Sequence, residues 1–101
     1  MGKIITVSPE GVVTVENSQS PPSLGYIQEK IGGGLDMLGW ANLNIRYRGV
    51  KSQFYVDDEG LLKGLPVNAK ASRIVQTDVW NGGRPIVGTM VILTGSARWL
   101  Y

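Results

Sequence analysis

Four arginines, with nearby aromatic, amide and hydroxyl side chains, are the residues of this chain best suited to hold an anionic ligand. The candidate ligand-binding residues are Arg46, Tyr47, Arg48, Asn68, Ser72, Arg73, Trp80, Asn81 and Arg84. A guanidinium fork matches two phosphate oxygens, and an aromatic ring stacks on a base. Amides and hydroxyls reach base edges and sugar hydroxyls. This set predicts a site for a nucleotide-like anion.

Each group of candidates also has an ordinary structural interpretation. Residues 42–50 alternate in polarity, which predicts a strand with Arg46 and Arg48 on one face; such charges also simply keep a strand soluble. Asn68 predicts the N-cap of a short helix over 69–76, although a helix start with a free Ser72 hydroxyl and Arg73 nearby also suits an anion. Both interpretations stay open. The loop 80–85 offers Trp80 for stacking and Arg84 for phosphate, or Trp80 fills the edge of the core.

Two further patterns are better explained by turns than by ligand sites. Asp57, Asp58 and Glu59 lack the alternate spacing of a calcium loop, so a solvated turn ending at Gly60 is expected. The triplet 32–34 is all glycine but lacks the Lys-Ser/Thr of a phosphate loop and follows a helix, so we expect a helix stop.

Composition excludes several classes of protein. The 101 residues include no His and no Cys, which removes zinc, iron–sulfur and haem sites built on those ligands, and Ser–His or Cys–His catalysis. No metal and no cofactor are expected. The formal net charge of +2 is too small for a duplex-DNA binder. Without a run of about 18 apolar residues or a secretory signal, we expect no membrane span and a cytoplasmic protein.

Polarity patterns predict an α+β fold in a single small domain, with two short helices on a mixed or antiparallel sheet of about five or six strands. The expected elements are a hairpin over 3–15, a loop over 16–22, a helix from Ser23 to Ile31 with Leu24, Ile27 and Ile31 inward, strands over 35–40, 42–50, 53–56 and 86–93, and a helix over 69–76. The strand 86–93 is apolar on both faces, so we expect it at the centre of the sheet. Gly88 inside it predicts a close approach by a neighbouring group.

Three stretches of the chain together form a pattern that resembles that of a known family of proteins. They are residues 27–33, residues 57–68 with Ala71-Ser72, and residues 86–92, in which a helix ends in glycine, an Asp-Glu-Gly turn leads to Leu-Pro-Val-Asn, and an Ile-Val-Gly strand follows. This pattern resembles a family of small domains of unknown function found in phages, plasmids and actinobacteria. The resemblance covers most of the chain after Ser23 and carries no catalytic motif. It implies a mobile-element protein in the cytoplasm of a bacterial host, often encoded near genes that counter host defence.

The domain 1–101 divides into the hairpin 3–15, the motif-bearing core 23–94 and an aromatic tail over 95–101. Trp99, Leu100 and Tyr101 suit a subunit interface, which predicts a homo-oligomer, either a dimer or a tetramer. The alternative is that the tail folds onto its own domain.

These observations lead to one expected function. We expect a non-catalytic, phage-type protein that sequesters a cyclic nucleotide immune signal, as an anti-defence sponge, with the ligand, a cyclic dinucleotide or a related signal, at a subunit boundary. An enzyme is disfavoured because the chain has no His and no Cys, and because no pair of carboxylates has a spacing that suits general acid–base catalysis. The alternatives are a protein-binding inhibitor or structural accessory protein of a phage or plasmid, with no small ligand, and a binder of single-stranded nucleic acid.

Overall fold

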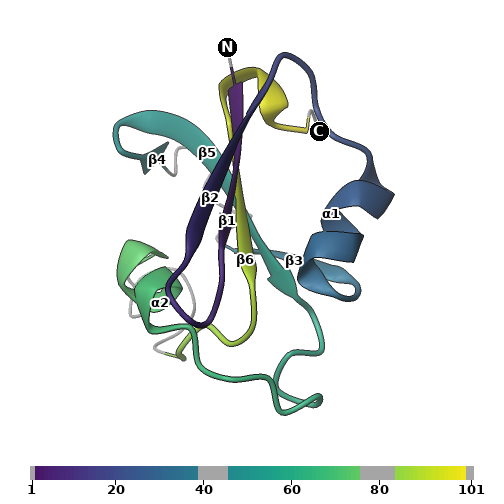
Figure 1. Cartoon of the computed structure of the whole chain (residues 1–101), viewed down its shortest axis with the longest axis vertical. Coiled ribbons are helices and arrows are strands. Elements are labelled where there is room, and N and C mark those ends of the chain that lie inside the picture. The colour runs from purple at the N-terminus through teal and green to yellow at the C-terminus, as the bar shows by residue number, and fades with distance from the viewer. Residues whose placement is uncertain (1, 39–45, 76–83, 100–101) are drawn as a thin grey trace.

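The chain folds as two helices on opposite faces of one antiparallel sheet (Figure 1). The computed structural model describes residues 2–38, 46–75 and 84–99. Its strands are β1 (Gly2–Val7), β2 (Val13–Ser18), β3 (Leu35–Leu38), β4 (Arg46–Tyr47), β5 (Val50–Asp57) and β6 (Met90–Thr94). Its helices are α1 (Leu24–Ile31) and α2 (Ala69–Val75), and a 3-10 turn, η1, spans Gly95–Ala97. The predicted α+β class with two short helices is confirmed.

The sheet order is β2-β1-β6-β5-β3, with β4 paired to β5 in a hairpin. All pairings between the described strands are antiparallel. The sheet is seen nearly edge-on in Figure 1, with β2 toward the viewer. The strand β6 lies between the first and fifth strands, so it joins the N-terminal hairpin to the rest of the sheet.

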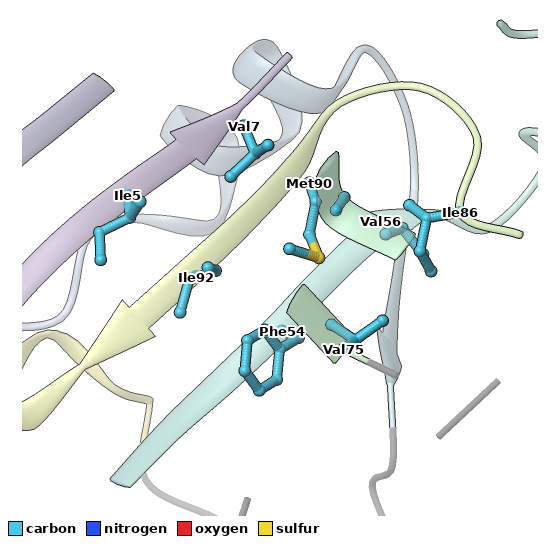
Figure 2. Packing of buried hydrophobic residues seen from close by; sticks show 9 residues of the cluster. Ile5, Val7, Phe54, Val56, Val75, Ile86, Met90 and Ile92 are labelled. Carbon is cyan, nitrogen blue, oxygen red and sulfur yellow. The ribbon is translucent and has the colours of Figure 1, made fainter. Parts of the chain in front are cut away.

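Alternation along the strands divides the core into two layers. On the α2 side, Met90 and Ile92 of β6 pack with Phe54 and with Val75 of the helix (Figure 2). On the α1 side, Val91 and Leu93 pack with Ile27 and Ile31. All residues of β6 are buried, which confirms the expectation of a strand covered on both faces.

The first helix begins and ends where the sequence predicts. The Ser23 hydroxyl accepts a hydrogen bond from the backbone N–H of Tyr26 at 3.2 Å, and Gly32 caps the C-terminus. Ile27 and Ile31 are buried as expected. The predicted inward orientation of Leu24 is wrong, because its side chain is 55% exposed in the first turn.

Three predicted boundaries are also wrong. Residues 16–18 continue β2 instead of starting a loop, because Glu16, Asn17 and Ser18 pair with β1. The last strand begins at Met90, not Ile86, since Gly88 takes a positive φ of +74° that interrupts the extended backbone. Residues 42–50 are not one strand, because the chain reverses at Arg48-Gly49; residues 42–45 lie outside the described ranges.

Within the described residues, no helix is long and apolar enough to cross a membrane.

Candidate functional site

The β4–β5 hairpin projects one of the predicted arginines from a tight turn. Arg48 and Gly49 form the turn, with φ of +53° and +78°. Positive φ at both central residues is typical of a type I′ turn, in which Asn-Gly is the favoured pair and Arg is strained. The Ser52 hydroxyl holds the hairpin by accepting from the Tyr47 N–H at 3.1 Å and donating to the Val50 carbonyl at 2.7 Å. The alternation predicted that Arg46 and Arg48 lie on one strand face. That prediction is wrong, because Arg48 lies in the turn and not in a strand.

An open groove lies on the α2 side of the sheet, between β2 and the β4–β5 hairpin. It consists of two adjoining hollows of about 250 and 550 Å³ that share Val13, Tyr47 and Arg48. The smaller hollow is also lined by Lys3, Ile5, Val15, Val50 and Thr94, and the larger by Lys70, Arg73 and Ile74. We call this feature the β2–β4 groove. The larger hollow is within the size range of small-ligand sites, about 300–1,000 Å³.

The groove carries charge of one sign. Lys3, Arg48, Lys70 and Arg73 line it, and no carboxylate is among its described lining residues. The described ion pairs, Lys30 with Glu16 and Lys63 with Asp57, lie elsewhere. The Arg48 guanidinium carbon sits 5.5 Å from the centre of the Tyr47 ring, so a cation and an aromatic face are presented together. A concave surface with one sign of charge attracts anions.

Three of the nine predicted ligand residues meet in this groove: Tyr47, Arg48 and Arg73. Arg84 lines a different hollow, of about 320 Å³, beside Asp58 and Glu59. Arg46 pairs with Lys51 through the strand register. Trp80 and Asn81 lie outside the described residues.

Asn68 and Ser72 have structural partners that account for them. Asn68 is fully buried, and its Oδ1 accepts from the Ala71 N–H at 3.0 Å, which confirms the predicted N-cap. Its Nδ2 donates to the carbonyls of Val7 and Gly88, each at 2.9 Å. The Ser72 hydroxyl donates to the Asn68 carbonyl at 2.9 Å and accepts from the Ile86 N–H at 2.8 Å. The free hydroxyl that the anion interpretation required does not exist, so we leave both residues out of the ligand set.

The segments that carry the sequence resemblance hold each other in place. The Asn68 N–H donates to the Ile86 carbonyl at 2.7 Å, the Gly88 N–H donates to the Pro66 carbonyl at 2.8 Å, and Val67 bridges to Val87. A Cβ on Gly88 would lie 2.7 Å from Leu65 Cδ1, which is the close approach expected there. These motifs therefore build the fold under α2, and the groove residues lie outside them.

Comparison with protein-family models, with curated proteins and with solved structures finds no match to this chain. The argument for an anion-binding site therefore rests on the geometry of the groove.

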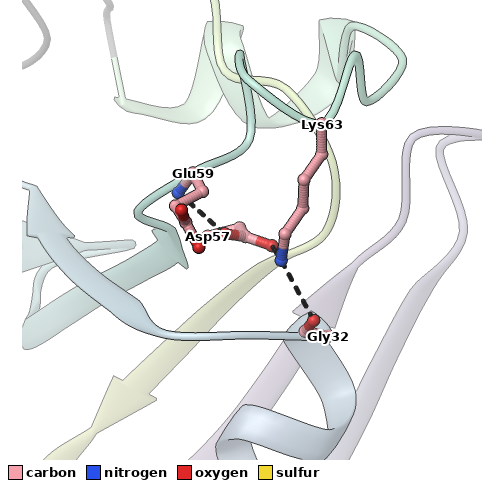
Figure 3. Close-up of polar contacts among 4 residues, drawn as sticks. All are labelled: Gly32, Asp57, Glu59 and Lys63. Atoms are coloured by element: carbon pink, nitrogen blue, oxygen red, sulfur yellow. Dashed lines mark hydrogen bonds and ion pairs between the residues drawn. The ribbon is translucent and has the colours of Figure 1, made fainter.

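The predicted solvated turn is confirmed for Asp58 and Glu59, which are exposed, and is wrong for Asp57, whose buried carboxylate forms an ion pair. The Asp57 side chain is only 1% exposed, and its Oδ2 accepts from Lys63 Nζ at 2.8 Å (Figure 3). Its Oδ1 accepts from the Glu59 N–H at 2.8 Å, and Lys63 also donates to the Gly32 carbonyl at 3.3 Å. The pair thus ties the end of α1 to the end of β5. In the described part of the chain, no three acidic groups gather as a metal site would require.

The same carboxylates argue against phosphate at the glycine triplet. A Cβ on Gly33 would meet the Lys63 ammonium and the Asp57 carboxylate that pairs with it, and one on Gly34 would lie 2.8 Å from both carboxylate oxygens of Asp58. An anion would be repelled by these carboxylates. The expected helix stop is confirmed by the left-handed cap at Gly32.

The Asp57–Lys63 pair predicts a pH-dependent effect of replacing Lys63 by Met. Burial raises the pKa of Asp57, but hydrogen bonds from Lys63 and the Glu59 N–H outweigh it and hold that pKa below its ordinary value. Because the folded pKa is depressed, the pair stabilises the protein above about pH 4, and this contribution is lost as pH falls through the folded pKa. Lys63→Met should lower the melting temperature by several degrees at pH 7 and by much less near pH 3.

Thermal unfolding of both proteins between pH 3 and pH 7 measures this difference. Lys51→Met removes an exposed lysine and is the matched control, for which we expect no pH-dependent loss. An equal deficit for Lys63→Met at both pH values would contradict the assignment of the effect to the Asp57 carboxylate.

The described part of the aromatic tail folds onto its own domain, which is the alternative left open by the sequence. Trp99 Nε1 donates to the Pro22 carbonyl at 2.7 Å, and its ring packs edge-on against Tyr55 with centroids 4.8 Å apart. Gln53 also bonds the Trp99 backbone at both its N–H and its carbonyl. Leu100 and Tyr101 lie outside the described residues.

Sequence reasoning missed Lys3, Lys70 and the valines of the groove. Two signals were available. The two-residue period of β1 places Lys3 on the same face as Ile5, and the spacing of Lys70, Arg73 and Ile74 places them on one side of α2. What brings these surfaces together is the sheet order, which neither signal contains.

Proposed function

We propose that this protein is a non-catalytic binding protein that sequesters a small anionic ligand of the nucleotide class, such as a cyclic dinucleotide, in the β2–β4 groove. The observation that supports this most is the groove lining, which combines four cations with an aromatic ring and an apolar wall. Phosphates require the cations, and a base requires the flat or apolar partners. The mobile-element resemblance supports a host signal as the ligand.

The strain at Arg48 adds an independent argument. An arginine at φ +53° costs about 1–3 kcal/mol relative to a residue suited to that conformation. Asn or Gly would form the same turn without that cost, yet the chain places a guanidinium there, stacked by Tyr47 and facing the groove. Strained residues gather at binding sites, where the surrounding structure holds them.

Arg48→Asn is therefore the most informative substitution for this proposal. It relieves the turn strain, so we expect the melting temperature to stay level or rise. Binding of cyclic di-GMP should weaken by about tenfold or more, because a charge-assisted contact contributes about 1.5–3 kcal/mol. Arg73→Ala should weaken binding similarly. Titration calorimetry on the folded proteins measures both effects.

Lys51→Ala provides the matched control, because Lys51 is exposed and alternates to the opposite side of β5 from the groove. It should leave binding unchanged. Chromatography of the released nucleotide should return it chemically intact, and linear products would contradict a role without catalysis. If the wild type binds neither cyclic dinucleotides nor mononucleotides, the proposal fails.

A further inference from the structure

We propose that a second copy of this chain pairs with the first along β2, in an antiparallel arrangement that joins two β2–β4 grooves into one two-fold-symmetric site. The strand β2 ends the sheet, and within the described residues β1 is its only strand partner. The strand pairing stands on the geometry of β2 alone. The composite site rests additionally on the function proposed above.

The ladder between β1 and β2 determines which backbone groups face outward. The Ser8 N–H donates to the Val12 carbonyl, so Ser8 and Val12 form a hydrogen-bonded pair. In the β1–β2 register, every second pair after this one is hydrogen-bonded as well. Residues facing each other alternate between hydrogen-bonded and non-bonded pairs. Thr14 and Glu16 therefore bond to β1, whereas the N–H and C=O groups of Val13, Val15 and Asn17 point away from the sheet.

This edge lacks the features by which proteins usually block strand pairing. Residues 13–18, Val-Thr-Val-Glu-Asn-Ser, contain no proline and no lysine. Val13 and Val15 are 39% and 54% exposed. The single charge, Glu16, is held by the Tyr26 hydroxyl at 2.6 Å and by Lys30 at 3.0 Å. An exposed edge strand that has no proline or lysine, and whose one charge is already paired, is a template for another strand.

The sequence of β2 fits pairing with itself. A two-fold axis beside Val15 sets that residue opposite its own copy and Val13 opposite the partner's Asn17, so all the outward groups meet in hydrogen-bonded pairs. Thr14 then faces the partner's Glu16, so no like charges are opposed. Other registers leave outward groups unpaired. A second copy of β2 can therefore pair all the outward backbone groups of this edge without opposing like charges.

The pairing also completes the groove. An axis perpendicular to the sheet leaves the same sheet face of both copies on one side. Val13 and Val15, which line the groove, would lie next to their counterparts, with Arg48 and Arg73 of each copy on either side. The result is one elongated site with an apolar centre and a pair of cationic ends. Its symmetry matches a cyclic dinucleotide, which has two phosphates and two bases.

Val15→Pro is a selective test of this interface. The Val15 N–H makes no bond to β1, so proline at this edge removes only an outward donor. Light scattering at about 100 μM should give twice the single-chain mass for the wild type and for Val15→Thr, which keeps the N–H and the branched shape. Val15→Pro should give the single-chain mass with a native circular dichroism spectrum.

A cross-link provides a second measurement that does not depend on the folding of the proline variant. The chain has no cysteine, so a single Val15→Cys is unambiguous. Opposed residues in a bonded pair have Cα atoms about 5.5 Å apart, within the span of a disulfide, about 4.4–6.8 Å. Oxidation should give a covalent dimer for Val15→Cys. Val12→Cys, exposed in the turn before β2, should stay largely uncross-linked.

The outcomes separate this inference from the proposed function. A single-chain mass for the wild type, or a dimer that Val15→Cys fails to cross-link, overturns β2 pairing. The composite site predicts one cyclic dinucleotide per two chains and weaker binding by the proline variant; one ligand per chain overturns that part. Arg48→Asn should weaken binding by about tenfold or more without changing the mass. Loss of the proposed function alone would appear as a β2-paired dimer that binds no nucleotide.

Discussion

Replacing Asn68 by Asp should produce a large loss of stability, about 4–5 kcal/mol at pH 7. Asn68 is fully buried, and its amide Nδ2 donates to the carbonyl oxygens of Val7 and Gly88. An ionised carboxylate cannot donate, so the variant would place a buried negative charge against two carbonyl oxygens. Domains of this size have about 5–15 kcal/mol of stability in total, so the variant should be close to unfolding.

Three comparisons make this prediction specific. Asn68→Ala should cost less, about 3 kcal/mol, because it removes three hydrogen bonds without adding a charge. Gln19→Glu makes the same change from amide to carboxylate at an exposed residue after β2 and should cost less than about 0.5 kcal/mol. Burial should raise the pKa of the introduced carboxyl, so the deficit of Asn68→Asp should shrink as pH is lowered. Urea unfolding at pH 7 and pH 4 measures all three.

Equal stability of Asn68→Asp and Asn68→Ala at pH 7 would contradict the prediction that an ionised carboxylate faces the two carbonyl oxygens.

The elements that the sequence predicted well are those defined by neighbouring residues. The turn at Pro9-Glu10-Gly11 lies between two β-branched runs, and the structure has a hairpin there. Ser23 and Gly32 mark the ends of α1 because a cap acts within one turn of the helix. Asn68 was predicted as a cap for the same reason. Its two other bonds reach Val7 and Gly88, which no local pattern connects to it.

The wrong predictions concern residues whose structure depends on an unusual backbone conformation or on contacts with residues distant in the sequence. The reversal at Arg48-Gly49 was hidden because Arg is not a usual residue for a positive φ, and polarity continues to alternate across the turn. Asp57 was assigned to solvent because three acidic residues in a row usually are solvated. In the structure, Lys63 turns back and covers its carboxylate. No periodic pattern in the sequence indicates the turn at Arg48-Gly49 or the ion pair between Asp57 and Lys63.

The candidate site was predictable in its chemistry and not in its location. Of the residues that the sequence singled out as cationic or aromatic groups for an anion, Tyr47, Arg48 and Arg73 line the groove, whereas Arg84 lines another hollow. The groove, however, joins residues far apart in the sequence, such as Lys3 and Arg73, because β1 lies beside β6 and α2 covers the same face. That arrangement depends on the sheet order, which a single sequence leaves open among several topologies.

Trp99→Ala should lower stability by about 3 kcal/mol and leave the oligomeric mass unchanged. The substitution removes the indole bond to the Pro22 carbonyl, worth about 1 kcal/mol, and the edge contact with Tyr55, about 0.5–1.5 kcal/mol. Lost apolar burial supplies the remainder. Trp99→Phe keeps an aromatic edge near Tyr55 and should lose only about 1–2 kcal/mol.

This prediction decides between the two roles that the aromatic tail can have. If Trp99 anchors a subunit interface, Trp99→Ala should reduce the mass measured by light scattering while the single chain keeps its folding stability at high dilution. If it fastens the tail to the domain, as its bonds to Pro22 and Gln53 indicate, the loss appears as a lower urea midpoint at every protein concentration. The oligomeric mass should then respond to Val15 on β2 and not to Trp99. Dissociation by Trp99→Ala with Val15→Pro still dimeric would reverse this assignment and place the interface at the tail.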